Sequence, residues 1–329
     1  MPGAFDAPSG IATYALIDVP SATFNVTVSV LIDAIAVSLA FQFEKPTHHI
    51  HFRHPLQAGV LDGGVSQKMK IAIRWATNAK RGALVPESPF LEKVALVTGA
   101  AKRIGRSVAL RLASEGADVV VNYRNSKSDA DEVVAKITAM GRRAIAVQAD
   151  VGKKKDVVAL FAAVKKEFGR LDILVNNAGM FFAAKFEELT EEQWDRILDT
   201  NLKSQFLCSQ AAAPMLRRSG HGRIVNFASL GGLLAWPSYT HYCVSKAGVI
   251  MLTRCLARAL APEITVNAIA PGTISFPGDA PELAEDFILR APLQRTGTAR
   301  DIEDAVVFLA QSAFVTGQVI VVDGGRTLT

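Results

Sequence analysis

From residue 91 onward, short apolar runs alternate with longer stretches in which apolar side chains recur every three to four positions. The short β-branched runs predict buried strands, and the longer periodic stretches predict amphipathic helices. The predicted strands are 94–98, 118–122, 144–148, 172–175, 223–228, 265–269 and 319–322, and the predicted helices are 104–115, 129–140, 154–168, 194–217, 242–259 and 301–310. This alternation predicts an α/β fold, a three-layer doubly wound parallel sheet of about seven strands with helices on both faces.

The first 90 residues lack this regular pattern. Residues 24–43 are strongly apolar but contain Asp33, and their first half alternates as a strand would. This favours a strand and leaves a membrane span as the alternative. Four of the six histidines lie within residues 48–54, where a metal site is the alternative to a loosely ordered tail. We therefore predict an N-terminal extension at 1–90, which an over-extended reading of the gene would also explain, and a single domain at 91–329.

Charge and cysteine content narrow the class of protein. The chain has 36 basic and 31 acidic residues, a net charge of +5, and no run of five or six like charges. A nucleic-acid partner is therefore not predicted. Cys208, Cys243 and Cys255 have neither a metal-ligand nor a CxxC spacing, which favours free thiols in a reducing compartment, the cytoplasm. We also predict no bound metal and no membrane partner.

The first predicted strand of the regular part stops at Gly99, and a helical pattern begins by Ile104 and Gly105. A strand, a tight turn and a helix N-terminus together aim backbone N–H groups and the positive end of the helix dipole at one point, which suits a phosphate. Gly99 permits the tight turn, and Gly105 permits close packing of the helix on the strand.

The rest of this region carries short motifs in a fixed order. They are Thr98-Gly99 through Gly105, Asn176–Gly179, Asn201, Ser229, Tyr242 with Lys246, and Pro271-Gly272. With these motifs, the chain from about Phe90 to its C-terminus resembles the short-chain dehydrogenase/reductase family. The resemblance implies a Rossmann-type sheet that binds a nicotinamide dinucleotide at the carboxyl edge of its strands, and assembly into a homotetramer or homodimer.

Two groups within this family are similar to the chain. The runs Thr98 to Gly105 and His241 to Gly248 are similar to bacterial pteridine reductases, and the catalytic set is equally similar to 3-oxoacyl-carrier-protein reductases. Arg103 replaces the family's middle glycine, as in the pteridine reductases, but Ser229 stands where those enzymes carry Asp. Phe276 replaces a threonine that often anchors the cofactor amide.

The predicted catalytic residues are Asn201, Ser229, Tyr242 and Lys246. Tyr242 and Lys246 are four positions apart on a predicted helix and share a face. A phenol pKa of about 10 is too high for proton transfer near neutrality, and a neighbouring ammonium should lower it. Ser229 would donate a hydrogen bond to a substrate oxygen as negative charge develops there. The resemblance adds that Lys246 holds the nicotinamide ribose and that Asn201 holds a water for proton relay.

The residues after the second strand predict which dinucleotide is used. An NAD enzyme usually carries Asp or Glu about 20 residues beyond the glycine turn, whereas this chain has Arg124 in an acid-free stretch. Arg103 and Arg124 would together bind a 2′-phosphate through charge-assisted hydrogen bonds, so NADP(H) is the predicted cofactor. The alternative is that both arginines are solvated surface residues. The predicted cofactor-binding residues are Thr98, Gly99, Arg103, Ile104, Gly105, Arg124, Asp150, Val151, Asn177, Ala178, Gly179, Tyr242, Lys246, Pro271, Gly272 and Ile274.

The predicted substrate is a small molecule with a carbonyl group. Met180, Phe181, Phe182, Trp236 and Phe276 fall on loops that would face the nicotinamide and shape an apolar or planar pocket, with simple loop packing as the alternative. The predicted function is NADPH-dependent reduction of the carbonyl of a ketone or of a 3-oxoacyl thioester to an alcohol. Pterin reduction is the alternative within the enzyme class, and a non-catalytic NADP-binding regulatory homologue is the alternative outside it.

Overall fold

The computed structural model describes residues 88–279 and 282–329, together with the backbone of four short strands nearer the N-terminus. The chain divides into two units, residues 1–76 and 77–329. The strands of the first unit form two antiparallel pairs, β1 (Ile17–Val19) with β2 (Ala22–Phe24) and β3 (Val26–Val30) with β4 (Val37–Phe41). β3 falls in the alternating stretch that was predicted as a strand. The histidine-rich segment at 48–54 lies outside the described residues.

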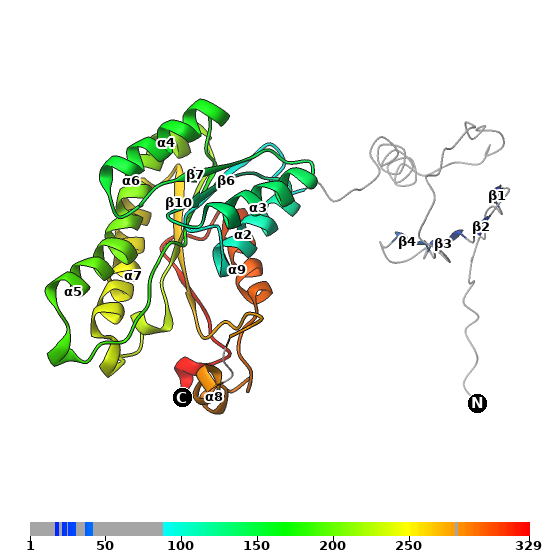
Figure 1. Cartoon of the computed structure of the whole chain (residues 1–329). Helices are drawn as coiled ribbons and strands as arrows, with labels where there is room; N and C mark the ends of the chain where they lie inside the picture. Colours follow the sequence, from blue (N-terminus) through cyan, green and yellow to red (C-terminus); the bar gives the residue numbers. More distant parts are fainter. Residues whose placement is uncertain (1–16, 20–21, 25, 31–36, 42–87, 280–281) are drawn as a thin grey trace, which may run out of the picture. The chain divides into compact units, whose positions relative to one another are not determined.

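A parallel sheet forms the centre of the second unit (Figure 1). Its strands are β5 (Val94–Val97), β6 (Asp118–Tyr123), β7 (Ala144–Gln148), β8 (Ile173–Asn176), β9 (Gly222–Phe227), β10 (Ile264–Pro271) and β11 (Val319–Val322). The order across this seven-stranded sheet is β11-β10-β9-β8-β5-β6-β7. The first strand of this sheet, β5, is therefore central. β6 and β7 extend the sheet on one side of β5, and β8 to β11 extend it on the other. The switch point lies between β5 and β8, where ligands bind in such sheets.

Helices cover both faces of the sheet, as predicted (Figure 1). One layer contains α2 (Arg103–Ser114), α3 (Lys127–Ala139) and α9 (Ala299–Gln311), and the other contains α4 (Lys154–Phe168), α6 (Ser204–Arg218) and α7 (Thr240–Leu260). Each layer buries its own apolar core against the sheet. Leu112 and Ile302 belong to the first core, and Leu160 and Leu216 belong to the second.

Two details differ from the prediction. The single helix expected at 194–217 is α5 (Glu191–Leu198) and α6, joined by a π-helical turn at Asp199–Lys203. The apolar periodicity continues through such a turn, so the sequence pattern did not reveal it. A further helix, α8 (Glu282–Arg290), was not predicted. It follows a stretch rich in proline and glycine at 271–281, whose composition indicates a loop.

Two of the expected absences can be examined in the described part of the chain. None of its helices combines the length and the apolar character that crossing a membrane requires. No three side chains of His, Cys, Asp or Glu gather there as metal ligands would.

A chain shortened to begin at Pro86 should fold and keep the reductase activity that the sequence predicts. The apolar cores of the second unit use residues from Phe90 onward, and the Phe90 N–H donates to the Glu115 carbonyl at 3.0 Å. Thermal unfolding followed by circular dichroism should give the same midpoint for this shortened chain as for the full one. If the shortened chain is insoluble, or lacks an activity that the full chain has, residues 1–85 are a structural part of the protein.

Candidate active site

The glycine turn lies between β5 and α2 at the carboxyl edge of the sheet. Gly99 has a φ of +62°, a conformation that favours glycine, and its N–H donates to the Asn122 side-chain oxygen at 3.2 Å. A Cβ on Gly105 would collide with the Gly99 carbonyl oxygen and with the Asn177 side-chain amide. No side chain of the described residues caps the start of α2, so its first N–H groups are available to an anion.

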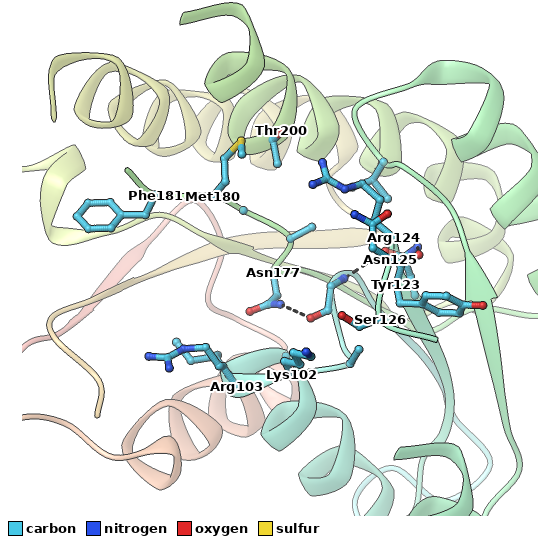
Figure 2. Close-up of a pocket in the computed structure, with 18 of the residues that line it drawn as sticks. Lys102, Arg103, Tyr123, Arg124, Asn125, Ser126, Asn177, Met180, Phe181 and Thr200 are labelled. Carbon is cyan, nitrogen blue, oxygen red and sulfur yellow. Dashed lines mark hydrogen bonds between the residues drawn. The ribbon is translucent and has the colours of Figure 1, made fainter. Parts of the chain in front are cut away.

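A cavity of about 600 Å³ opens above this turn (Figure 2). Most of the predicted cofactor-binding residues line it: Gly99, Arg103, Ile104, Gly105, Arg124, Asp150, Val151, Asn177, Ala178, Gly179, Tyr242, Gly272 and Ile274. Thr98, Lys246 and Pro271 do not line it. Thr98 instead holds the loop after β8 in place: its hydroxyl oxygen accepts hydrogen bonds from the N–H groups of Asn177 and Ala178, both at 3.0 Å. The predicted residues therefore come together around one cavity of ligand size.

Several lining residues were missed from the sequence. They are Ala101, Lys102, Asn122, Tyr123, Asn125, Ser126, Ala149 and Thr200. Lys102 has the clearest chemical meaning, because its ammonium pairs with Asp129 at 3.2 Å near the start of α3, close to the loop that carries Arg124. The sequence feature that could have identified Lys102 is its position next to Arg103 in the glycine turn.

The side chain of Arg103 is held in an ion pair that the sequence does not predict. Its guanidinium donates two hydrogen bonds to the Asp279 carboxylate, at 2.7 and 3.0 Å, and lies 4.6 Å from the centre of the Phe276 ring. These bonds hold the pKa of Asp279 down to about 2. Figure 2 shows the side chains of Arg103 and Arg124 on opposite sides of the cavity. The two guanidinium groups therefore do not converge on one phosphate site in this structure, because Asp279 pairs with Arg103.

Ser229 and Tyr242 lie together where the cavity meets α7. The Ser229 hydroxyl oxygen accepts a hydrogen bond from the Gly231 N–H at 3.2 Å, which starts a short 3₁₀ turn. A Cβ on Gly231 would lie 3.0 Å from the Tyr242 ring, so this turn packs directly on the tyrosine. Burial raises the pKa of Tyr242 to about 12, and a hydrogen bond with Ser229 opposes this rise.

Lys246 lies one helical turn after Tyr242 and is almost fully buried. Its ammonium donates to the Phe227 carbonyl oxygen at 2.8 Å and lies 5.8 Å from the centre of the Tyr242 ring. Burial lowers the pKa of Lys246 to about 8. Burial is the largest influence on the Tyr242 pKa, so Tyr242 is a neutral phenol near neutral pH.

Asn201 occupies the π-helical turn and is completely buried. Its side-chain oxygen accepts from the Met180 N–H at 2.8 Å, and its amide donates to the Met180 carbonyl at 3.0 Å and to the Ser245 hydroxyl at 3.1 Å. These bonds fix the backbone after Gly179 against α7. Asn201 therefore positions the loop that carries Met180 and Phe181 beside Tyr242.

Known proteins match this part of the chain closely. The 3-oxoacyl-[acyl-carrier-protein] reductase FabG of Staphylococcus aureus is 46% identical over 241 residues, covering 71% of this chain and 98% of that protein. A family described as enoyl-(acyl carrier protein) reductase matches residues 99–327. The chain belongs to the short-chain dehydrogenase/reductase family. The resemblance seen in the sequence is thereby confirmed.

Two further matches agree with this assignment. The (2S)-[(R)-hydroxy(phenyl)methyl]succinyl-CoA dehydrogenase subunit BbsD of Thauera aromatica is 44% identical over 248 residues, covering 72% of this chain and 97% of that protein. A solved structure from Sinorhizobium meliloti, described as a short-chain alcohol dehydrogenase, has a TM-score of 0.70 and 36% identity, and the match covers 74% of this chain and all of that one. This short-chain dehydrogenase/reductase is an NAD(P)-dependent oxidoreductase that acts between alcohol and carbonyl groups.

The cavity fits such a dinucleotide. The glycines let the turn pack closely on the loop after β8, and the open N–H groups at the start of α2 suit a pyrophosphate. The Tyr242 end of the cavity suits the nicotinamide, which supplies or accepts a hydride when bound.

The efficiency with NADPH should fall as the pH rises through about 8. Lys246, with a pKa of about 8, carries its charge below that pH and loses it above. We expect kcat/KM for NADPH, which reports on groups of the free enzyme, to be level from pH 6 to about 7.5 and to fall above about 8. NADPH binding by Tyr242→Phe should show the same decline, because the pKa of Tyr242, about 12, lies outside this range. Level binding up to about pH 9.5 would contradict the role of the Lys246 charge.

Proposed function

We propose that this enzyme is an NADPH-dependent reductase of ketones, with 3-oxoacyl thioesters as its substrate class. The observation that carries the proposal is Ser229 beside the buried phenol of Tyr242 at one end of the cavity. A serine hydroxyl can donate a hydrogen bond to a carbonyl oxygen on which negative charge develops. The 46% identity to a 3-oxoacyl-[acyl-carrier-protein] reductase supports the thioester class.

Each catalytic residue has a separate task in the proposed reaction. Ser229 donates a hydrogen bond to the substrate carbonyl oxygen, and Tyr242 gives that oxygen its proton. Tyr242 remains protonated throughout the neutral range, because burial raises its pKa to about 12, so it is in the correct state to act as an acid. The Lys246 ammonium binds the ribose and favours the phenolate that forms. Asn201 positions the loop and takes part in reprotonating Tyr242 through a held water.

The proposal also covers the domain organisation, the cellular compartment and the oligomeric state. Residues 1–90 form an extension outside the catalytic domain at 91–329. The enzyme works in the cytoplasm as a homotetramer or homodimer, which size-exclusion chromatography with light scattering would test. All three cysteines of the sequence, Cys208, Cys243 and Cys255, are free thiols, in keeping with a reducing compartment.

Pterin reduction is a second candidate function, and Phe181 is the residue that favours it. Phe181 exposes an aromatic ring at the Tyr242 end of the cavity, and a flat heterocycle could stack on it. Ser229 opposes this candidate, because a hydroxyl cannot replace the carboxylate that relays a proton to the pterin ring.

The deciding experiment compares acetoacetyl-CoA with dihydrobiopterin at equal concentrations and the same NADPH concentration. We expect faster oxidation of NADPH with the thioester. Faster turnover of the pterin would contradict the proposed function and would mean that another group supplies the proton. Turnover of neither compound, with NADPH still bound, would favour a regulatory role.

A further inference from the structure

An aromatic cluster, Phe181, Trp236 and Tyr239, surrounds the Tyr242 ring. Phe181 stacks face to face on Tyr239, with ring centroids 4.5 Å apart and an interplanar angle of 3°. Phe181 also meets Tyr242 edge-on at 4.7 Å, and Trp236 lies parallel to Tyr242 at 6.2 Å. Trp236 and Tyr239 do not line the cavity assigned to the dinucleotide, so dinucleotide binding alone does not explain the cluster.

The two stacked members of the aromatic cluster come from separate segments that are fastened together. Phe181 lies in the loop after β8, and Tyr239 lies in the turn before α7. Between these segments the Ala184 N–H donates to the Ser238 carbonyl at 2.9 Å. The cluster is therefore arranged before a substrate arrives, which lowers the entropy cost of binding.

Phe181 remains open to the cavity despite these contacts. It is 57% exposed and lines the same cavity as Tyr242. Figure 2 shows it at the end of the cavity opposite Arg124 and Ser126. An aromatic ring left exposed at the apolar end of a cavity offers a stacking partner to a flat apolar group.

We propose that the aromatic cluster selects ketones whose carbonyl carbon carries an aromatic ring, so that the enzyme reduces 3-aryl-3-oxoacyl thioesters. This inference rests on the carbonyl reduction proposed above. The substrate oxygen must come within about 3 Å of the Tyr242 hydroxyl, and the Phe181 ring is centred 4.7 Å from the Tyr242 ring. A ring bonded directly to the carbonyl carbon can then reach Phe181 within the range of about 4.5–7 Å over which aromatic rings interact. A ring at the far end of a long acyl chain is held several bonds away from this position.

The test compares two ketones of similar size, the CoA thioesters of 3-oxo-3-phenylpropionate and 3-cyclohexyl-3-oxopropionate. The measured quantity is the ratio of their kcat/KM values with NADPH. The intrinsic reactivity of each ketone is the same in every variant, so a change in this ratio reports on the aromatic contact. Phe181→Leu and Tyr239→Leu should each lower the phenyl-to-cyclohexyl ratio about 3- to 10-fold.

Phe186→Leu is the matched control, because Phe186 is 67% exposed, lies in the same loop and has no part in the aromatic cluster. It should leave the ratio unchanged. A ratio that stays within about twofold in both cluster variants, or an equal fall in Phe186→Leu, overturns the inference. Reduction of acetoacetyl-CoA without reduction of the phenyl ketone also overturns it and leaves carbonyl reduction standing. Failure to reduce any of the three thioesters overturns the proposed function itself. Thermal midpoints and NADPH affinities are measured for each variant, so that ratios are compared only between folded proteins.

Discussion

Replacing Tyr242 with phenylalanine should lower kcat for reduction of acetoacetyl-CoA by about 10²–10⁴-fold, the usual contribution of general acid catalysis. The phenol is the proton donor of the proposed reaction, and it shares a hydrogen bond with Ser229. Stopped-flow or steady-state loss of NADPH absorbance measures the effect. The variant keeps the ring that packs against Gly231 and Phe181, so we expect an unchanged fold.

Two controls separate lost chemistry from lost structure. NADPH affinity of Tyr242→Phe should stay close to that of the unmutated enzyme when followed by fluorescence quenching. Tyr239→Phe removes a hydroxyl three residues earlier and keeps the stacked ring, so it should cost far less activity than Tyr242→Phe. A Tyr242→Phe variant that retains more than half of its activity would show that another group donates the proton.

The strands and the helices that flank the sheet could be predicted because the sequence carries them locally. Each buried parallel strand has a continuous apolar run, and the helix between two strands has its own periodicity. α8 escaped prediction because its signal is a nine-residue pattern behind several prolines and glycines. Asn201 in the π-helical turn bonds through its side chain to Met180 and Ser245, and local periodicity does not report such contacts.

In the candidate site, too, arrangements set by residues close in sequence could be predicted, and those set by residues far apart in sequence could not. Gly99, Gly105 and the pair Tyr242 with Lys246 are set by spacing within one turn or one helix, and the sequence predicts their arrangement. The partner of Arg103 is Asp279, 176 positions away on the loop after β10, so only the folded chain brings the two together. The raised pKa of Tyr242 likewise depends on burial by several elements, which a helical spacing does not reveal.

Arg124 should determine the choice between the two dinucleotides. It is exposed at the cavity, next to Asn125 and Ser126, and no ion pair in the described part of the chain occupies its guanidinium. Lys102, which pairs with Asp129, lines the same cavity and adds positive charge there. A 2′-phosphate there would gain charge-assisted hydrogen bonds, which contribute about 1.5–3 kcal/mol each. We therefore propose that NADPH is preferred over NADH.

The variant Arg124→Asp should lower the ratio of kcat/KM for NADPH to that for NADH at least about 100-fold. The loss of a charge-assisted hydrogen bond accounts for about 10- to 150-fold, and repulsion between the new carboxylate and the phosphate adds to it. The new carboxylate can also accept a hydrogen bond from the ribose 2′-hydroxyl, which favours NADH. The ratio is measured with acetoacetyl-CoA held constant.

Arg143→Asp is the matched control for the change in net charge. Arg143 pairs with Glu167 and lies over the Phe168 ring, and it does not line the cavity, so this variant should leave the ratio nearly unchanged. Arg103→Ala tests the other arginine of the glycine turn. Because Asp279 holds its guanidinium on the opposite side of the cavity from Arg124, we expect NADPH and NADH to be affected alike. Equal efficiency of the unmutated enzyme with both dinucleotides would contradict the argument for Arg124. A ratio that falls in Arg103→Ala but not in Arg124→Asp would instead place the 2′-phosphate beside Arg103, with the Asp279 pair broken when the cofactor binds.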